Sequence, residues 1–519
     1  MIRRLLPALL LAPLGAIPAQ LPLLTAPAGV LRIELGGGFF PTDELRIDGT
    51  RRPLGSRLSY PTLDAAATPL VGNTEAALAR VLGRAPGPLT LGSVSAIAEQ
   101  QRGVATLGLA VGITRRLTFS ASVPIVSTRT QLQLRPVATD ANVGLNPADA
   151  ALGTPAGIAQ TTAFFTAFDE ALTALSGRIA GGAFTNPTQL ALAQQTLGQG
   201  TTLRDGLFQL LADPVRGSAV LPVASSTDGS AVLAAITALD ATLGGALGGR
   251  TISAAPALPA AVLTATDLDA LIAAPTGFGI TEPEDIPPVG LGDVELGLTA
   301  EVLRRGAPGD ASWLGVWARA GARLSTGTAP RPGYLLDQGS GDGQPDVEVG
   351  GIVELGRGRF GLRGSALMTL QLAGTADEQP ATRDQLFRPA RITALLSRNP
   401  GDVFTITAQP FYRIVPHFAL TALVQYQRRG ADALNWADPT QAIAGLDLTT
   451  LVQGTSANAT RVGLGVSFVH DGVNREGVRK MPVEAGFSIE RTVASSAGVV
   501  ATPLTSRMVI RVYKPIIGR

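Results

Sequence analysis

Charged side chains recur at every second position in several segments of this sequence. In GLGDVELGLTAEVL (290–303), the apolar residues alternate with Asp293, Glu295 and Glu301. On one face of a sheet, carboxylates and guanidinium groups can pair with one another or contact a polar solute. We predict that such charges point into a lumen and line a pore. The predicted pore-lining residues are Glu295, Glu301, Arg319, Arg323, Glu348, Glu354, Arg363, Glu484, Glu490 and Arg511.

Motifs for catalysis are missing from the sequence. His417 and His470 are the only histidines, and each lies at the end of a predicted strand. Ser467 is near His470 in sequence, but the odd offset predicts opposite faces of the strand. No HExxH, GxSxG or P-loop is evident. We therefore expect neither an enzyme nor a bound cofactor.

The acidic stretch DQGSGDGQPDVE (337–348) superficially resembles a calcium-binding loop. Its acids are Asp337, Asp342, Asp346 and Glu348, and their spacing differs from that of an EF-hand. Two interpretations stay open: a calcium site, or a glycine-rich loop that enters a strand. We favour the loop and expect no metal.

Apolar and polar residues alternate in many segments, as expected for strands with one apolar face. Together these segments give about twelve strands, each near the ~10 residues that a tilted barrel strand needs to cross a bilayer. They lie in 31–35, 103–113, 117–125, 290–303, 314–324, 347–354, 362–371, 404–409, 418–427, 462–468, 483–490 and 508–512.

The connections between these segments alternate in length. Five are short, at 114–116, 304–310, 356–359, 415–417 and 471–480. Longer connections fall between them, at about 41–102, 128–288, 327–344, 374–400 and 428–458, and a short one at 495–502. Outer-membrane barrels show this alternation, with short periplasmic turns and long outer loops. An even number of strands would place both termini on the periplasmic side.

The ends and the composition of the chain agree with export. Residues 1–19 combine Arg3 and Arg4 with a short apolar stretch, the pattern of a signal peptide. There is no cysteine, and the net charge of +2 falls to near zero without these two arginines. No basic run suggests nucleic acid. The chain is 45% hydrophobic, yet after the signal no apolar run reaches the ~18 residues of a membrane helix.

The apolar strand faces contain no arginine or lysine, so they could meet lipid. We predict an all-β fold for 20–519, a transmembrane antiparallel up-and-down β-barrel of about 12 strands, with strands in about 31–40, 103–127 and 290–514. We expect it in the bacterial outer membrane. A soluble β-protein is the alternative, but it would need a second layer to cover apolar faces on every strand.

The segment 128–288 interrupts the strand pattern and is rich in Ala, Gly, Thr and Leu. Phe164, Phe168, Leu172 and Leu175 recur at helical spacing, and Asn186-Pro187 is typical of a helix start. We predict a large, partly helical extracellular insertion that forms a cap over the barrel or a plug in its mouth. The alternatives are a poorly ordered low-complexity loop and a separate catalytic domain.

Aromatic residues make up only 5% of the chain, so interfacial girdles would be thin. Six aromatic residues lie near predicted strand ends: Trp313, Trp317, Phe360, Tyr412, Tyr426 and Tyr513. Barrels of this type often carry a terminal aromatic residue as an assembly signal, and here KPIIGR follows Tyr513. The expected partners are outer-membrane lipid and the barrel-assembly machinery.

Several short motifs resemble an outer-membrane family named for the MetA pathway of phenol degradation. They are FSASVPIV (119–126), GLGDV (290–294), RLSTGT (323–328) and GSGDGQPDVEVG (339–350). Ser325 stands where the family has proline, and the insertion at 128–288 is longer than expected. The resemblance implies a channel or transporter for a small molecule, aromatic or otherwise hydrophobic. The alternative function is a non-conducting structural or binding barrel whose outer loops contact a partner.

Overall fold

The computed structural model describes most of the chain. The described residues are 24–214, 216–249, 252, 255–281, 289–306, 311–331, 333–382, 385–415, 417–442, 447–470 and 482–516. The predicted signal peptide, 1–19, lies outside them.

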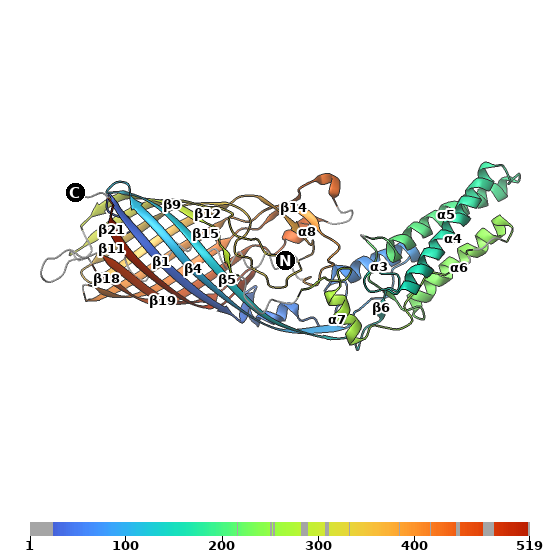
Figure 1. The fold of residues 1–519 in the computed structure, drawn as a ribbon, viewed down its shortest axis with the longest axis horizontal. Coiled ribbons are helices and arrows are strands. Elements are labelled where there is room, and N and C mark those ends of the chain that lie inside the picture. Colours follow the sequence, from blue (N-terminus) through green and yellow to red (C-terminus); the bar gives the residue numbers. More distant parts are fainter. Residues whose placement is uncertain are drawn as a thin grey trace.

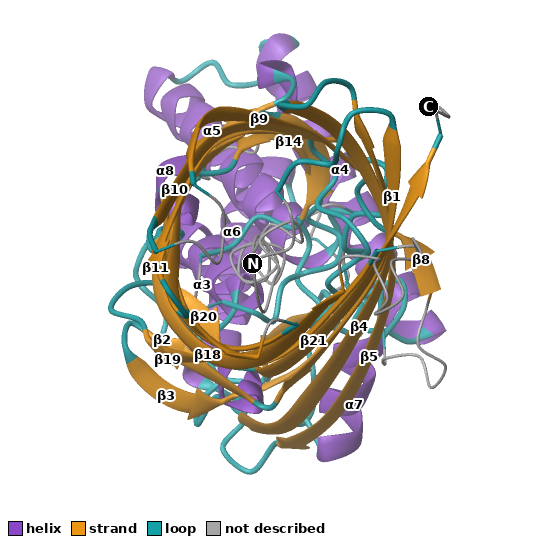
Figure 2. Cartoon of the chain, turned by 90° about the vertical axis from the view of Figure 1, so that its left-hand side faces the viewer, coloured by secondary structure: helices purple, strands orange, loops and turns teal. Residues whose placement is uncertain are grey.

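A closed ring of twelve antiparallel strands forms the body of the molecule (Figure 2). Each strand pairs with its neighbour in chain order, and the last strand pairs with the first, which closes the ring. The strands are β1 (Val30–Thr42), β4 (Ser93–Gly112), β5 (Leu117–Val137), β9 (Glu295–Arg305), β10 (Trp313–Arg323), β11 (Asp346–Arg357), β12 (Phe360–Gln371), β15 (Val403–Val415), β16 (Phe418–Arg429), β18 (Ala457–His470), β19 (Val483–Ala494) and β21 (Leu504–Pro515).

The two faces of the barrel wall differ in chemistry. Outward residues are large and apolar, and many are exposed, such as Leu464 at 72% and Met508 at 54%. Inward residues are polar or charged and mostly buried, such as Thr421, Gln425 and Arg511. An exposed apolar wall with every strand paired is what a bilayer requires. The predicted all-β transmembrane barrel is confirmed, and the soluble β-protein does not fit this outer surface.

Small sheets and short helices cover the end of the barrel that carries the long loops, which we call the long-loop end. The opposite end carries the short turns, the start of β1 and the end of β21, and we call it the short-turn end. One small sheet joins β2 (Glu44–Ile47), β3 (Thr50–Pro53) and β20 (Val499–Ala501), and another joins β13 (Gly374–Glu378), β14 (Ala394–Asn399) and β17 (Ala433–Trp436). The remaining short elements are η1 (Leu54–Leu58), β8 (Val289–Leu291), η2 (Pro439–Gln441) and α8 (Leu448–Val452).

The β4–β5 hairpin is longer than the sequence analysis expected. Strand pairing was predicted to end at 127, but the ladder continues without a break to Ser93↔Val137. The outward residues change from apolar Ile125 to polar Arg129 and Gln131, so the extension lies beyond the apolar band. Figure 1 shows the hairpin leaving the barrel and reaching the helical part of the chain. The predicted boundary of the insertion at 128 is therefore wrong by about ten residues.

Beyond this hairpin stands a helical region that we call the arm (Figure 1). It contains α3 (Pro69–Leu82), α4 (Pro155–Ala180), α5 (Pro187–Leu211), α6 (Thr227–Leu247), α7 (Ala265–Ala273), β6 (Val143–Leu145) and β7 (Val220–Pro222). Sequence signals set these helix starts: a Thr or Asn side chain caps α3, α4 and α5, and proline follows the cap in each. The arm draws on two loops, since α3 precedes β4 in the chain.

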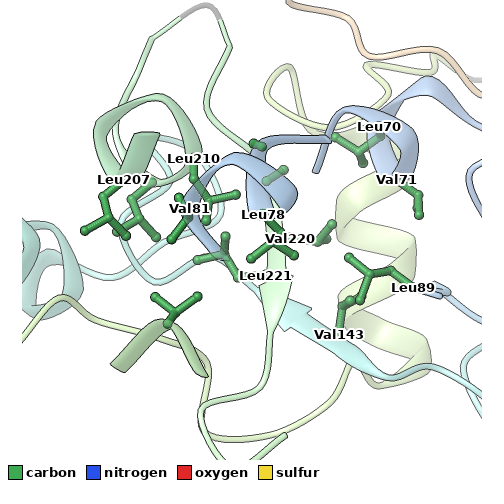
Figure 3. Packing of buried hydrophobic residues seen from close by; sticks show 14 of the residues in the cluster. Leu70, Val71, Leu78, Val81, Leu89, Val143, Leu207, Leu210, Val220 and Leu221 are labelled. Atoms are coloured by element: carbon green, nitrogen blue, oxygen red, sulfur yellow. The ribbon is translucent and has the colours of Figure 1, made fainter. Parts of the chain in front are cut away.

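A single apolar core holds the arm together. Phe164, Phe168 and Leu175 of α4 are fully buried, so the predicted helical spacing marks the buried face. Figure 3 shows Leu78 of α3 packed near Leu210 of α5 and Val220 of β7. By length and composition α6 could cross a membrane, yet Val232, Ile236 and Leu243 belong to this same core. A poorly ordered loop does not fit this packing.

Three of the six aromatic residues expected at the membrane interface point the other way. Trp313, Trp317 and Tyr513 share the inward parity of the lumenal arginines and are buried. Phe360 and Tyr412 are exposed on the outer face, and their rings lie 4.8 Å apart. Alternation along β10 decides the matter, because Trp313 and Trp317 are an even number of residues from Arg319.

A charge on the outer wall should destabilise the barrel in a depth-dependent way. Leu464 is near the middle of β18, so Leu464→Arg should cost about 2–4 kcal/mol of folding free energy in lipid vesicles. Gln131→Arg, on the outward face of the hairpin extension, should cost about 1 kcal/mol or less. Urea titration of vesicle-folded protein measures both. Equal costs for the two variants would contradict the assignment of Leu464 to the lipid face.

Candidate functional site: the barrel lumen

Two adjoining cavities lie inside the barrel. The larger, of about 160 Å³, is toward the long-loop end, and we call it the upper cavity. The smaller, of about 100 Å³, is the lower cavity. Both are lined by Glu295, Leu296, Arg319 and Arg507, so these residues stand where the cavities meet. The free space thus continues along the lumen past one charged junction.

Small side chains form one wall of the lower cavity. They come from four consecutive strands of the ring, β1, β4, β5 and β9, and include Gly36, Gly38, Thr106, Gly108, Ala110, Ser120, Ser122 and Gly297. Long arginine side chains, Arg319, Arg507 and Arg511, also line this cavity. The lumen therefore keeps its space beside the strands whose inward residues are short.

Ion pairs between strands occupy much of the remaining lumen. Arg319 Nε lies 2.8 Å from Glu348 Oε1, on the next strand. Arg511 Nε lies 2.5 Å from Glu34 Oε2 and its Nη1 lies 3.6 Å from Glu484 Oε2. Such pairs fit the low-dielectric interior because each charge has a counter-charge on an adjacent strand.

The structure brings five of the ten predicted pore-lining residues to the cavities. Glu295, Arg319, Arg323 and Glu348 line the upper cavity, and Arg511, like Glu295 and Arg319, lines the lower one. Whether they line a permeation path stays a prediction.

The other five predicted residues line neither cavity and are engaged in ion pairs. Glu354 and Arg363 pair at 2.7 Å, and both are almost fully buried. Glu484 pairs with Arg511, and Glu490 lies 3.6 Å from Arg507 Nε. Glu301 pairs at 2.6 Å with Arg304 near the short-turn end.

Four cavity-lining arginines are absent from the predicted pore-lining set: Arg32, Arg102, Arg398 and Arg507. Arg32 lies in a recognised alternating segment, and Arg398 lies in β14, outside the ring. Arg102 lies in β4, one residue before the segment in which alternation was recognised. Arg507 has the same parity as the predicted Arg511, four residues away in β21. Extending the alternating patterns of β4 and β21 by one strand position would have identified Arg102 and Arg507.

A loop over residues 324–345 forms part of the upper cavity, which Ala329, Gln338 and Gly341 line. The Asp293 carboxylate accepts hydrogen bonds from the backbone N–H of Gly327 at 2.8 Å and of Asp342 at 3.3 Å. Burial, followed by the nearby Asp342 charge, raises the pKa of Asp293.

The acids of the calcium-like stretch serve in this loop. Asp342 pairs with Arg323 at 2.7 Å, and Asp346 also contacts Arg323. Asp337 pairs with Arg331 at 3.1 Å. These contacts agree with the favoured interpretation of a glycine-rich loop that enters a strand.

Aromatic rings narrow the lumen toward the short-turn end. The rings of Trp313 and Phe411 have centroids 6.3 Å apart, and the Arg413 guanidinium lies 4.8 Å from the Trp313 ring. Phe411 lies flat against the wall because Gly361 has no side chain: a Cβ there would come within 2.0 Å of the ring. The inward tryptophans thus take up lumenal space.

No known family profile and no curated protein matches this sequence. Among solved structures, the chain is similar to an outer membrane channel from Pseudomonas putida F1, with 9% identity, 94% of this chain and 96% of that chain covered, and a TM-score of 0.38. It is also similar to the P. putida toluene transporter TodX, with 10% identity, 95% and 92% covered, and a TM-score of 0.26. With TM-scores this low, the likenesses carry no functional conclusion, and membership of the MetA-pathway family remains an expectation.

The buried Glu354–Arg363 pair generates a test of the lumenal electrostatics. Glu354→Gln leaves Arg363 buried beside a neutral group, so it should destabilise the barrel by about 3–5 kcal/mol. Glu354→Leu combined with Arg363→Met removes both charges and should recover most of that loss. Urea titration of the vesicle-folded variants provides the comparison. If the double variant is less stable than Glu354→Gln, the cost of the single substitution does not come from leaving the Arg363 charge without its counter-charge.

Proposed function

We propose that this protein is an outer-membrane channel that lets a small molecule pass through its lumen. The observation that carries the proposal is the adjoining pair of lumenal cavities, which meet at Glu295, Arg319 and Arg507. A barrel that served only as a scaffold would gain stability by filling this space with packed side chains. The small side chains of β1, β4 and β5 instead leave it open.

The outer surface supports the outer membrane as the location. Barrels with an exposed apolar band, short turns at one end and long loops at the other are typical of that membrane. We propose that the short-turn end faces the periplasm and that the arm lies outside the cell. Lipid and the barrel-assembly machinery are the partners that such a location implies.

Passage would use exchange of hydrogen bonds along the wall. A polar group of the solute could contact Arg319 and Glu295 at the junction and then exchange hydrogen bonds with the hydroxyl groups of Ser120, Ser122 and Thr106. Resemblance to the MetA-pathway family favours an aromatic or otherwise hydrophobic solute. Nothing in this mechanism needs a covalent step, in line with the prediction that the protein is not an enzyme.

A non-conducting binding or structural barrel is the second candidate. It is favoured by the loop over 324–345, which Asp293 holds at the upper cavity, and by the aromatic rings near the short-turn end. The arm would then serve as the surface that meets a partner. The two candidates differ in whether solutes cross the lumen.

Single-channel recording in planar bilayers decides between them. The purified protein should give discrete conductance steps, and Arg319→Ala combined with Arg323→Ala should change their size or ion selectivity, because both arginines line the upper cavity. Arg129→Ala combined with Arg135→Ala removes an equal charge from the exposed outer face and serves as the control. A silent wild-type barrel, shown to be folded by heat-modifiable migration on gels, would favour the binding barrel.

A further inference from the structure

We propose that the upper cavity is a binding site for a small monocarboxylate with an apolar body, such as an aromatic acid. Its carboxylate would lie between Arg102 and Arg507, and its body would lie against the apolar residues beside them. The inference rests on the proposed function, because it names the class of solute that would pause in the lumen.

Arg102 is a buried cation without a counter-charge in contact. Its side chain is 6% exposed, and it lines the upper cavity. Nη1 donates to Gln338 Oε1 at 3.1 Å and to the Gly339 carbonyl at 3.2 Å, while Nε is buried without a hydrogen-bond acceptor. Within the described part of the chain, no carboxylate forms an ion pair with Arg102. A buried guanidinium in this state would gain from an anion supplied by a ligand.

Arg507 is the second cation at the site and is also only weakly neutralised. It is 7% exposed and lines both cavities. Its Nε lies 3.6 Å from Glu490 Oε2, too far for a hydrogen bond, and finds no other acceptor. The guanidinium lies 5.3 Å from the centre of the Phe40 ring. That contact fixes the cation beside an aromatic surface and leaves hydrogen-bond donors for a ligand.

Strand register brings the two arginines to the same part of the wall. Gly38 of β1 lies between Val104 of β4 and Arg507 of β21. Two residues along the same strand, Phe40 lies opposite Arg102. The two cations therefore flank the Phe40 side chain, one on each neighbouring strand.

The rest of the upper cavity fits an apolar ring or short chain. Phe40, Val104, Pro124, Val126 and Leu296 line it on the side of the two arginines. Its volume of about 160 Å³ is close to the ~150 Å³ that suffices for benzene in an apolar protein cavity. Apolar walls beside two cations suit a molecule with one anionic end.

Six acids line the same cavity, and five of them are engaged with other groups. Glu348 pairs with Arg319, Asp342 and Asp346 contact Arg323, Asp293 accepts two backbone N–H groups, and Glu378 also has an interaction within the protein. At the junction with the lower cavity, Glu295 accepts a 3.4 Å hydrogen bond from the Ser122 hydroxyl. A second carboxylate on the ligand would approach Glu295 and be repelled.

Equilibrium binding of benzoate and benzamide to the full-length protein in detergent micelles tests the proposal. The two probes have the same ring and nearly the same size, but only benzoate is anionic. Calorimetric titration should show benzoate binding at least about tenfold more tightly than benzamide. Arg102→Met and Arg507→Met should each weaken benzoate binding about tenfold or more and leave benzamide nearly unchanged. Arg129→Met, on the exposed outer face, is the matched control and should change neither.

Equal affinity for the two probes in the wild-type protein would overturn the proposal, and this comparison needs no variant to fold. Benzoate binding that persists after both methionine substitutions would also overturn the proposal, when heat-modifiable migration on gels shows that these variants are folded. Single-channel recording separates this failure from that of the proposed function. A barrel that conducts but does not prefer benzoate would support the channel function and contradict the carboxylate site. A barrel that does not conduct but prefers benzoate would support the site and contradict the channel function.

Discussion

Pairing of every backbone N–H and C=O group within the membrane is the constraint on which the rest of this structure depends. A bilayer offers no water to unpaired groups, so a sheet that spans it must close. Closure here comes from β1 and β21, which pair from Val30↔Pro515 to Phe39↔Ser506. Once the ring is closed, each residue faces either lipid or lumen, and the period of two divides the chemistry of the whole wall.

Closure also concentrates charge inside the barrel. Inward positions that were all apolar would pack together and close the lumen. A buried charge without a counter-charge would be costly, because burial removes its hydration. The chain meets both conditions by placing opposite charges on neighbouring strands, as Arg319 and Glu348 show on β10 and β11. Where inward residues are small, on β1, β4 and β5, the lower cavity stays open beside the Arg511–Glu34 pair. Free volume and weakly neutralised cations therefore occur on the same side of the lumen.

Period-two alternation made the barrel wall predictable from sequence. It gave the strands and the inward direction of residues such as Glu354 and Arg363, because side-chain direction in a strand depends only on position. The inward position of Trp313 and Trp317 was not predicted, because tryptophan is typical of the membrane interface, although the parity of both residues indicated the lumen. Arg102 was missed because the polar residues Gln100 and Gln101 precede it, so the apolar alternation in β4 was recognised only from 103 onward. Pairing partners of the lumenal charges depend on strand register and loop contacts, which single-strand patterns do not contain.

The GLGD segment (290–293) continues the barrel wall where β5 extends past its pairing with β9. The β4–β5 hairpin extends outward to carry the arm, so β5 pairs with β9 only from Leu117 to Ser122. Gly292 then donates its N–H to the Pro124 carbonyl at 2.8 Å, an approach at which a Cβ would lie 2.8 Å from the Pro124 ring. The adjacent Asp293 turns inward and holds the loop at Gly327. Glycine for contact with β5 and aspartate for the lumen are thus joined in one short segment, at the place where the wall would otherwise be incomplete.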